Sequence, residues 1–214
     1  AVLTVEKVGK VDLPAPDIFF GNDKMEVTDT DIYKSDQAFT QGQMITVTGI
    51  DNLNEWWIDP DFFEKQSDGA LKFLPINGDY RVTANAVLKY FSVMALKDGK
   101  PAKLQDDGTG AIWAIGKGIG KPSVTSSEVG WEPGKALCLA QVASKKYQLT
   151  LKAGETLKTS GDPEVISFKF FHQNDWGGEF GNYASSILVE QLKLADSGNL
   201  EMQDNKAFEE GAVY

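Results

Sequence analysis

Short alternating segments separated by turns constrain this chain more than any other feature of its sequence. Residues 80–84 and 87–96 alternate apolar and polar side chains and are rich in β-branched and aromatic residues, which is typical of β-strands. The sequence contains no convincing long amphipathic helix. Many short strands at turn-rich spacing favour an all-β chain of β-sandwiches. Further strands are predicted at residues 2–8, 43–50, 111–115, 136–142, 147–151, 166–171 and 199–202, whereas 185–194 fits either a helix or a strand.

The order of these segments predicts two tandem modules. Residues 1–16 are expected to form an N-terminal strand and a stiff proline-rich linker, because proline lacks a backbone donor and restricts the residue before it. Residues 17–108 read as one module and residues 109–214 as a second, with the boundary in the Asp- and Gly-rich stretch 105–110. Residues 208–214 look like the start of a closing strand. Residues 2–8 are expected to pair with an edge of one module, since an open edge invites aggregation.

Composition and charge exclude several classes of partner. Hydrophobic residues make up 42% and charged residues 24%, which is ordinary for a globular protein. The net charge of −10 makes nucleic acid and anionic membrane surfaces poor partners, whereas a neutral ligand is indifferent to it. No apolar run is long enough to span a bilayer. The chain opens with Ala1 rather than Met, so we expect processing from a longer precursor.

Three polar or reactive motifs each have an ordinary structural interpretation. Residues 116–123 (GKGIGKPS) invite a phosphate-loop interpretation, but Pro122 occupies the Ser/Thr position and no helix pattern follows, so a structural loop is favoured. His172 is the only histidine, which excludes a metal site built on several histidines, and a hydrogen-bonding role at a strand end is expected. Cys138 lies in an apolar run, is expected in the core, and has no partner for an internal disulfide.

The acidic residues raise the possibility of a glycosidase that uses two opposed carboxylates. The candidates are Asp59, Asp61, Glu128, Glu132 and Glu179. Sequence does not show which carboxylates face one another, and in a chain this acidic we expect them to be solvated surface groups. No twelve-residue calcium loop is present. We therefore predict no catalytic residue, no metal ligand and no cofactor.

The tryptophans are the stronger functional signal. Trp113 lies in a strand pattern and is expected in the core, whereas Trp56 and Trp57 are adjacent, so that one could face the core and the other solvent, or both could be core. Trp131 and Trp176 lie among Gly, Pro, Asp and Asn residues, which favours exposed loops. An indole held in a polar loop can offer its face to a flat, weakly apolar ligand such as a sugar ring.

Six motifs follow one another in the C-terminal half: residues 112–116 (IWAIG), 130–131 (GW), 136–140 (ALCLA), 147–151 (YQLTL), 168–171 (FKFF) and 175–178 (DWGG). In this order they resemble the carbohydrate-binding modules of SusE/SusF-type surface glycan-binding lipoproteins. The resemblance implies β-sandwich modules, an immunoglobulin-like module at residues 17–108, and non-catalytic glycan capture at the outer-membrane surface through a lipid anchor that these residues do not include. Trp131 and Trp176 match the family's aromatic platform and Lys169 its polar donor, and Gln173 is a further expected polar contact. Residues 116–118 (GKG) depart from the family's pattern, which commonly has a carboxylate at this position.

Three functions compete on the sequence alone. The leading hypothesis is binding of a neutral polysaccharide or oligosaccharide at the cell surface, with a single-site affinity of about micromolar to millimolar. The second is a small carboxylate-dependent glycosidase, and the third is a structural spacer or a module that docks to an outer-membrane transporter. Exposure of the two loop indoles separates the first hypothesis from the third.

Overall fold

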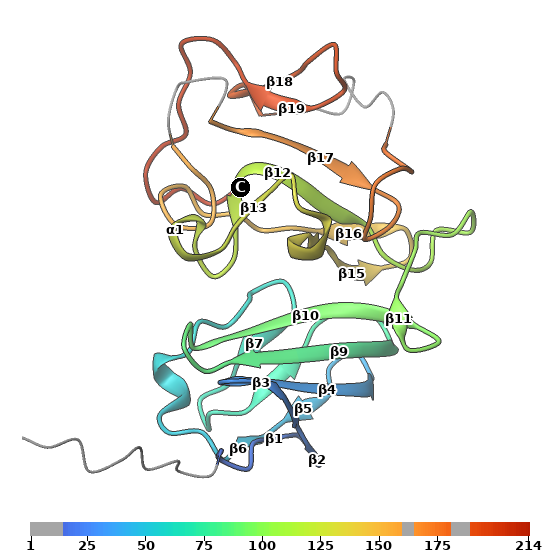
Figure 1. Cartoon of the computed structure of the whole chain (residues 1–214), viewed down its shortest axis with the longest axis vertical. Helices are drawn as coiled ribbons and strands as arrows, with labels where there is room; N and C mark the ends of the chain where they lie inside the picture. The colour runs from blue at the N-terminus through green and yellow to red at the C-terminus, as the bar shows by residue number, and fades with distance from the viewer. Residues whose placement is uncertain (1–14, 160–164, 181–188) are drawn as a thin grey trace, which may run out of the picture.

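The computed structural model describes residues 15–159, 165–180 and 189–214. It confirms the all-β prediction, because the chain forms two β-sandwich domains that lie one above the other in Figure 1. The one α-helix in the described part of the chain, α1 (Val124–Ser127), has four residues. No helix among these residues is long and apolar enough to cross a membrane.

The N-terminal domain contains three antiparallel sheets. A five-stranded sheet in the order β11-β10-β9-β4-β3 is covered by two three-stranded sheets, β2-β1-β6 and β5-β8-β7. The elements are β1 (Phe19–Phe20), β2 (Asp23–Lys24), β3 (Glu26–Asp29), β4 (Ile32–Phe39), β5 (Met44–Ile45), β6 (Val47–Thr48), η1 (Leu53–Glu55), β7 (Phe63–Lys65), β8 (Leu71–Phe73), β9 (Gly78–Asn85), β10 (Tyr90–Lys97) and β11 (Lys100–Pro101).

Aromatic side chains fill the core of this domain. Phe91 on β10 lies at the centre: the Trp56 ring stacks on it with a centroid distance of 4.5 Å, and the edge of Phe20 meets it at 5.2 Å. On the other side of the core Phe39 and Phe73 pack at 4.9 Å. The four phenylalanine rings come from all three sheets, and such pairs add about 0.5–1.5 kcal/mol each beyond the area they bury.

Two local predictions for this domain need correction. Residues 43–50 do not form one strand, because the chain changes sheets at Thr46: β5 pairs with β8, whereas β6 pairs with β1. Trp56 and Trp57 do not lie on a strand, since Trp56 directly follows η1. Trp56 is buried in the core, and Trp57 is half-buried against the second domain.

The C-terminal domain is built on a six-stranded antiparallel sheet. Its order is β13-β12-β17-β19-β18, with β14 also paired to β12, and the β15–β16 hairpin lies beside the N-terminal domain in Figure 1. Trp113 and Cys138 are buried in its core, as expected. The elements are β12 (Trp113–Gly120), α1, β13 (Glu128–Gly130), η2 (Pro133–Lys135), β14 (Leu137–Cys138), β15 (Ala140–Ala143), β16 (Lys146–Gln148), β17 (Ser167–Phe171), β18 (Leu192–Leu194) and β19 (Leu200–Met202).

The glycine-rich run that was predicted to be a loop continues β12 instead. Gly116 has a φ of +145°, and a Cβ there would lie 2.3 Å from the Phe168 Cα on β17. A Cβ on Gly120 would lie 2.4 Å from the Ser127 carbonyl oxygen. The glycines therefore let neighbouring backbones approach closely along a strand that contains a register shift, which is the role glycine often has at bulges.

Both ends of the C-terminal domain are held by backbone hydrogen bonds. Tyr214 and Leu151 exchange two N–H to C=O bonds of 2.8 and 2.9 Å, so the last residues pair with the segment after β16. At the other end, Trp113 Nε1 donates to the Ala102 carbonyl at 3.0 Å, and the Leu104 N–H donates to the His172 carbonyl at 2.8 Å. The interdomain connection is thus fixed to the sheet that follows it. Residues 2–8, which were predicted to pair with a module edge, lie outside the described residues, and so does most of the proline-rich linker.

Candidate functional site

Two loops of the C-terminal domain bring Trp131 and Trp176 together. Their ring centroids are 6.3 Å apart and the planes differ by 25°. This separation lies within the range of directly packed, offset aromatic pairs. The two indoles therefore pack on each other, and a ligand would stack on an outer face rather than between the rings.

Glycines with positive φ place both indoles. Gly130 ends β13 with a φ of +58° immediately before Trp131. After Trp176, Gly177 and Gly178 have φ values of +82° and +66° and turn the chain back. The His172 N–H then donates to the Gly178 carbonyl at 2.8 Å, which closes the loop. Glycine adopts such angles more readily than other residues, so the local sequence favours this loop shape.

The pair has a buried base and an open side. Phe171, fully buried on β17, meets Trp176 nearly edge-on at 6.0 Å and 74°. Trp131 is half-buried and packs against the hydrophobic core. Trp176 remains 50% exposed, which is unusual for so large an apolar side chain. The arrangement supports one indole from below while part of it stays open to solvent.

The two predicted polar contacts differ in their positions. Gln173 lies in the same loop, and its Nε2 donates to the Trp176 carbonyl at 2.5 Å, so its amide nitrogen is used inside the loop. Lys169 Nζ instead donates to the Ser197 carbonyl at 2.8 Å, in the turn between β18 and β19. Within the described residues, no contact joins Lys169 to either indole. The same loop contains Asn174, whose buried side-chain oxygen has no hydrogen-bond partner in the described part of the chain.

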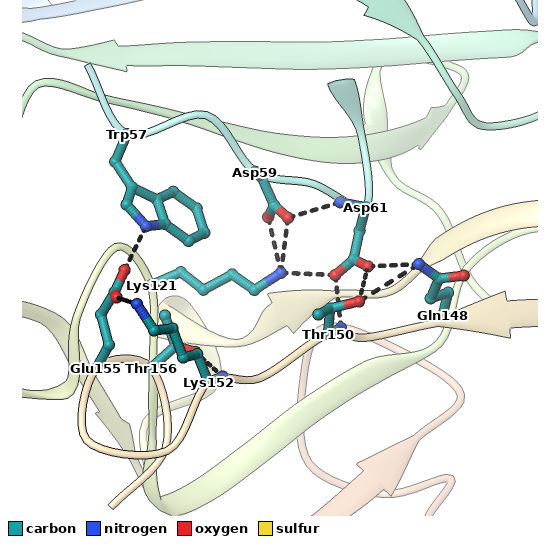
Figure 2. Close-up of polar contacts among 9 residues, drawn as sticks. All are labelled: Trp57, Asp59, Asp61, Lys121, Gln148, Thr150, Lys152, Glu155 and Thr156. Carbon is teal, nitrogen blue, oxygen red and sulfur yellow. Dashed lines mark hydrogen bonds and ion pairs between the residues drawn. The ribbon is translucent and has the colours of Figure 1, made fainter. Parts of the chain in front are cut away.

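The expectation that Asp59 and Asp61 are solvated is wrong. Their exposed fractions are 3% and 1%, and they lie between the two domains. Lys121 of the C-terminal domain reaches across, and its Nζ donates to Asp59 at 2.8 and 2.9 Å and to Asp61 at 2.7 Å (Figure 2). A charge leaves water at high cost unless it is paired and hydrogen-bonded. The domain interface supplies that pairing.

The two carboxylates differ in their surroundings. The pKa of Asp61 lies below its usual value. Burial alone would raise this pKa, but the Lys121 charge and the Thr150 backbone and hydroxyl donors outweigh the effect of burial. Asp61 also accepts from Gln148 Nε2 at 2.9 Å. Burial raises the pKa of Asp59, and the nearby Asp61 charge adds to this against the opposing effect of Lys121. One ammonium thus serves two carboxylates, and Asp61 holds its charge more firmly.

Further hydrogen bonds connect the domains around this cluster. Trp57 Nε1 donates to Glu155 Oε1 at 2.7 Å, and Lys152 Nζ donates to the other oxygen of the same carboxylate at 2.9 Å (Figure 2). The Ile76 N–H donates to the Gln141 carbonyl at 2.8 Å. The domains are therefore connected by directional bonds as well as by apolar contact.

Two of the other acidic candidates are ion-paired with lysines. Glu128 accepts from the Gly118 N–H at 2.8 Å and pairs with Lys158 at 2.9 Å. Glu132 pairs with Lys135 on the surface. Among the described residues, no group of three His, Cys, Asp or Glu side chains is placed to hold a metal ion.

Sequence reasoning missed the base of the indole pair and the interdomain ion cluster. Phe171 lay within the predicted strand 166–171, but the strand pattern did not indicate that its ring supports Trp176. Lys121 likewise carried no signal of its pairing, because its partners lie about sixty positions earlier in the chain.

Comparison with known proteins assigns families but no activity. Residues 107–214 match the family described as "Domain of unknown function (DUF5121)", and residues 11–104 match "Domain of unknown function (DUF5125)". No curated protein and no solved structure matches the chain. Because the first match covers just over half of the 214 residues, the chain belongs to the DUF5121 family.

Proposed function

We propose that this protein binds a neutral glycan without catalysis, through the indole pair Trp131 and Trp176. The observation that carries the proposal is the half-exposed Trp176 ring, supported from behind by Trp131 and from below by Phe171. A sugar stacks its apolar C–H face on such a ring. The rigid support lowers the entropy cost of binding, because the ring is already fixed before the ligand arrives.

Polar groups beside the ring supply the hydroxyl contacts. Gln173 keeps its side-chain oxygen as an acceptor, since only its nitrogen is used in the loop. The unpaired Asn174 oxygen in the same loop is buried, so it is an acceptor for a trapped water rather than for a ligand hydroxyl. Each hydrogen bond is worth about 0.5–1.5 kcal/mol net, so one site should bind weakly. Several copies on a surface would compensate by avidity.

The acidic residues favour binding over hydrolysis. A glycosidase needs an acid and a second carboxylate that both reach the substrate. Asp59 and Asp61 are instead buried and bonded to Lys121. From the resemblance to SusE/SusF-type lipoproteins we also propose a location at the outer-membrane surface and a transporter complex as a further partner.

A second candidate function has its own support. The buried Lys121 cluster and the Trp57–Glu155 bond join the domains firmly, as a spacer or a transporter-docking module would require. Such a module needs no ligand on the indole pair. The two functions therefore differ in whether the exposed ring binds anything.

Isothermal titration against neutral plant and host polysaccharides tests the proposal. The wild-type chain should bind at least one, Trp176→Ala should weaken that binding at least tenfold, and Trp176→Phe should retain most of it because a ring remains. Val87→Ala, at an exposed site on the other domain, is the control and should bind like wild type. Unchanged binding by the Trp131→Ala, Trp176→Ala double variant would show that the site is elsewhere. Absence of binding across the panel would favour the spacer.

A further inference from the structure

A cleft separates the two domains beside the buried ion cluster. Its volume is about 660 Å³, and its walls come from β10 of the N-terminal domain and from α1 and the segment before β14 of the C-terminal domain. This size lies within the usual range of small-ligand sites, and domain interfaces are a preferred place for them.

The cleft is formed before any ligand arrives. Asp59 and Lys121 contribute to its lining, and their mutual bonds fix one wall against the other. Phe62 and Trp113, both fully buried, also contribute to its lining from the cores of the two domains. A ligand would therefore meet walls that need no closing movement.

The charges that line the cleft are already compensated. They are two acids, Asp59 and Glu128, and two bases, Lys121 and Lys135. Asp59 pairs with Lys121, Glu128 with a lysine outside the cleft, and Lys135 with Glu132. An ionic ligand would find no unpaired charge of opposite sign, so the cleft is suited to a neutral one.

Uncharged hydrogen-bonding groups remain free on both walls. The hydroxyls of Ser92 on β10 and Thr125 on α1 have no hydrogen-bond partner in the described structure. The Asn85 oxygen accepts from the Leu88 N–H at 2.9 Å, and its amide nitrogen is left as a donor. Met94 adds an apolar surface on the same wall. Donors and acceptors beside an apolar strip match a molecule that carries hydroxyls around a C–H surface.

We infer that this interdomain cleft is a second binding site, for a neutral hydroxyl-rich ligand the size of one or two sugar residues. The site is separate from the indole pair and does not depend on it. It differs from that pair because no exposed aromatic ring lies among its described lining residues. Binding therefore relies on hydroxyls and the amide, which makes it weak and selective for ligand stereochemistry.

The experiment uses the full chain with Trp131→Ala and Trp176→Ala, so that only the cleft can respond. Neutral mono- and disaccharides of glucose, galactose, mannose and xylose are titrated to tens of millimolar while backbone amide shifts are followed by NMR. At least one sugar should shift the amides of Ser92, Asn85 and Thr125 with a saturating curve. Absence of saturating shifts at these amides for every sugar overturns the inference.

Two added variants make the result decisive. Ser92→Tyr fills the cleft and should reduce affinity at least tenfold, whereas Met44→Tyr, at an exposed site on β5 outside the cleft lining, should leave it unchanged. If Ser92→Tyr does not fold, Thr125→Tyr on the exposed opposite wall replaces it. Tighter binding by galacturonate than by galactose would contradict the neutral ligand class. A failure here leaves the indole-pair proposal intact, because that site is tested with the unmodified tryptophans.

Discussion

Replacement of Lys121 by methionine is expected to lower the free energy of unfolding by about 3–5 kcal/mol, the usual cost of removing one partner of a buried ion pair. Methionine preserves much of the side-chain volume but removes the charge and three hydrogen bonds. The loss falls unequally on the two acids. Asp59 retains only the Asp61 N–H at 3.0 Å, whereas Asp61 keeps Gln148 and two donors from Thr150.

The unequal loss predicts a partial rescue. Asp59→Asn added to Lys121→Met removes the carboxylate left without a counter-charge, and should recover on the order of 1–3 kcal/mol, the cost of an unsatisfied buried group. Asp61→Asn should rescue less, because three donors still hold that carboxylate. The comparison of the two double variants therefore tests which acid depends more on the ammonium.

Urea unfolding followed by far-UV circular dichroism and tryptophan fluorescence is the assay. The thermal unfolding midpoint of Lys121→Met should fall by about 6–20 °C, because a loss of 1 kcal/mol lowers the midpoint by about 2–4 °C in a chain of this length. Lys72→Met is the matched control: its pair with Glu64 at 3.1 Å is exposed, so it should cost less than about 1 kcal/mol. If Lys121→Met costs no more than this control, the cluster does not hold the domains together and the reasoning fails.

Three further predictions follow from other parts of the structure. Gly116→Ala should destabilise the chain by about 1–3 kcal/mol in urea unfolding, because its Cβ would meet the Phe168 backbone; an unchanged midpoint would contradict the close approach. Burial raises the pKa of the Cys138 thiol to about 12, so iodoacetamide at pH 8 should label it only in urea, and mass spectrometry that finds rapid native labelling would refute this. The Arg81 hydrogen bonds lower the pKa of Asp36 in the folded state. The Asp36–Arg81 pair therefore stabilises the fold fully above the unfolded pKa of about 3.9, and this contribution is lost as the pH falls through the lower folded pKa. Asp36→Asn should therefore reduce the acid sensitivity of the unfolding midpoint below about pH 4, and an unchanged acid profile would argue against it.

Local patterns predicted the strands well because the two-residue period is local. Val82 alternates with the polar residues Arg81 and Thr83 and is fully buried in β9. The same logic placed Trp113 in the core. It failed at Thr46, where the chain changes sheets without a proline or glycine to mark the change. It also failed at Gly116, since glycine commonly marks a turn and here makes room for a neighbouring backbone.

Local sequence patterns could not predict contacts between residues that lie far apart in the chain. Turn residues around Trp131 and Trp176 predicted loops, but the stacking of two rings 45 positions apart depends on the whole sheet. Lys169 matched the expected position in the strand, yet its ammonium is bound to the Ser197 carbonyl. Asp59 was predicted to be a surface acid because no residue near it in the sequence indicates that it pairs with Lys121.

The interdomain connection also has a mechanical consequence. The carbonyl of Ala102 and the N–H of Leu104 are both bonded to the second domain, and the Gln105 N–H donates to the Thr109 carbonyl, so the connection is a closed turn rather than a slack tether. Torque applied to one domain therefore passes directly to the other. Whatever holds the N-terminal domain thus also sets the direction in which the Trp176 ring points.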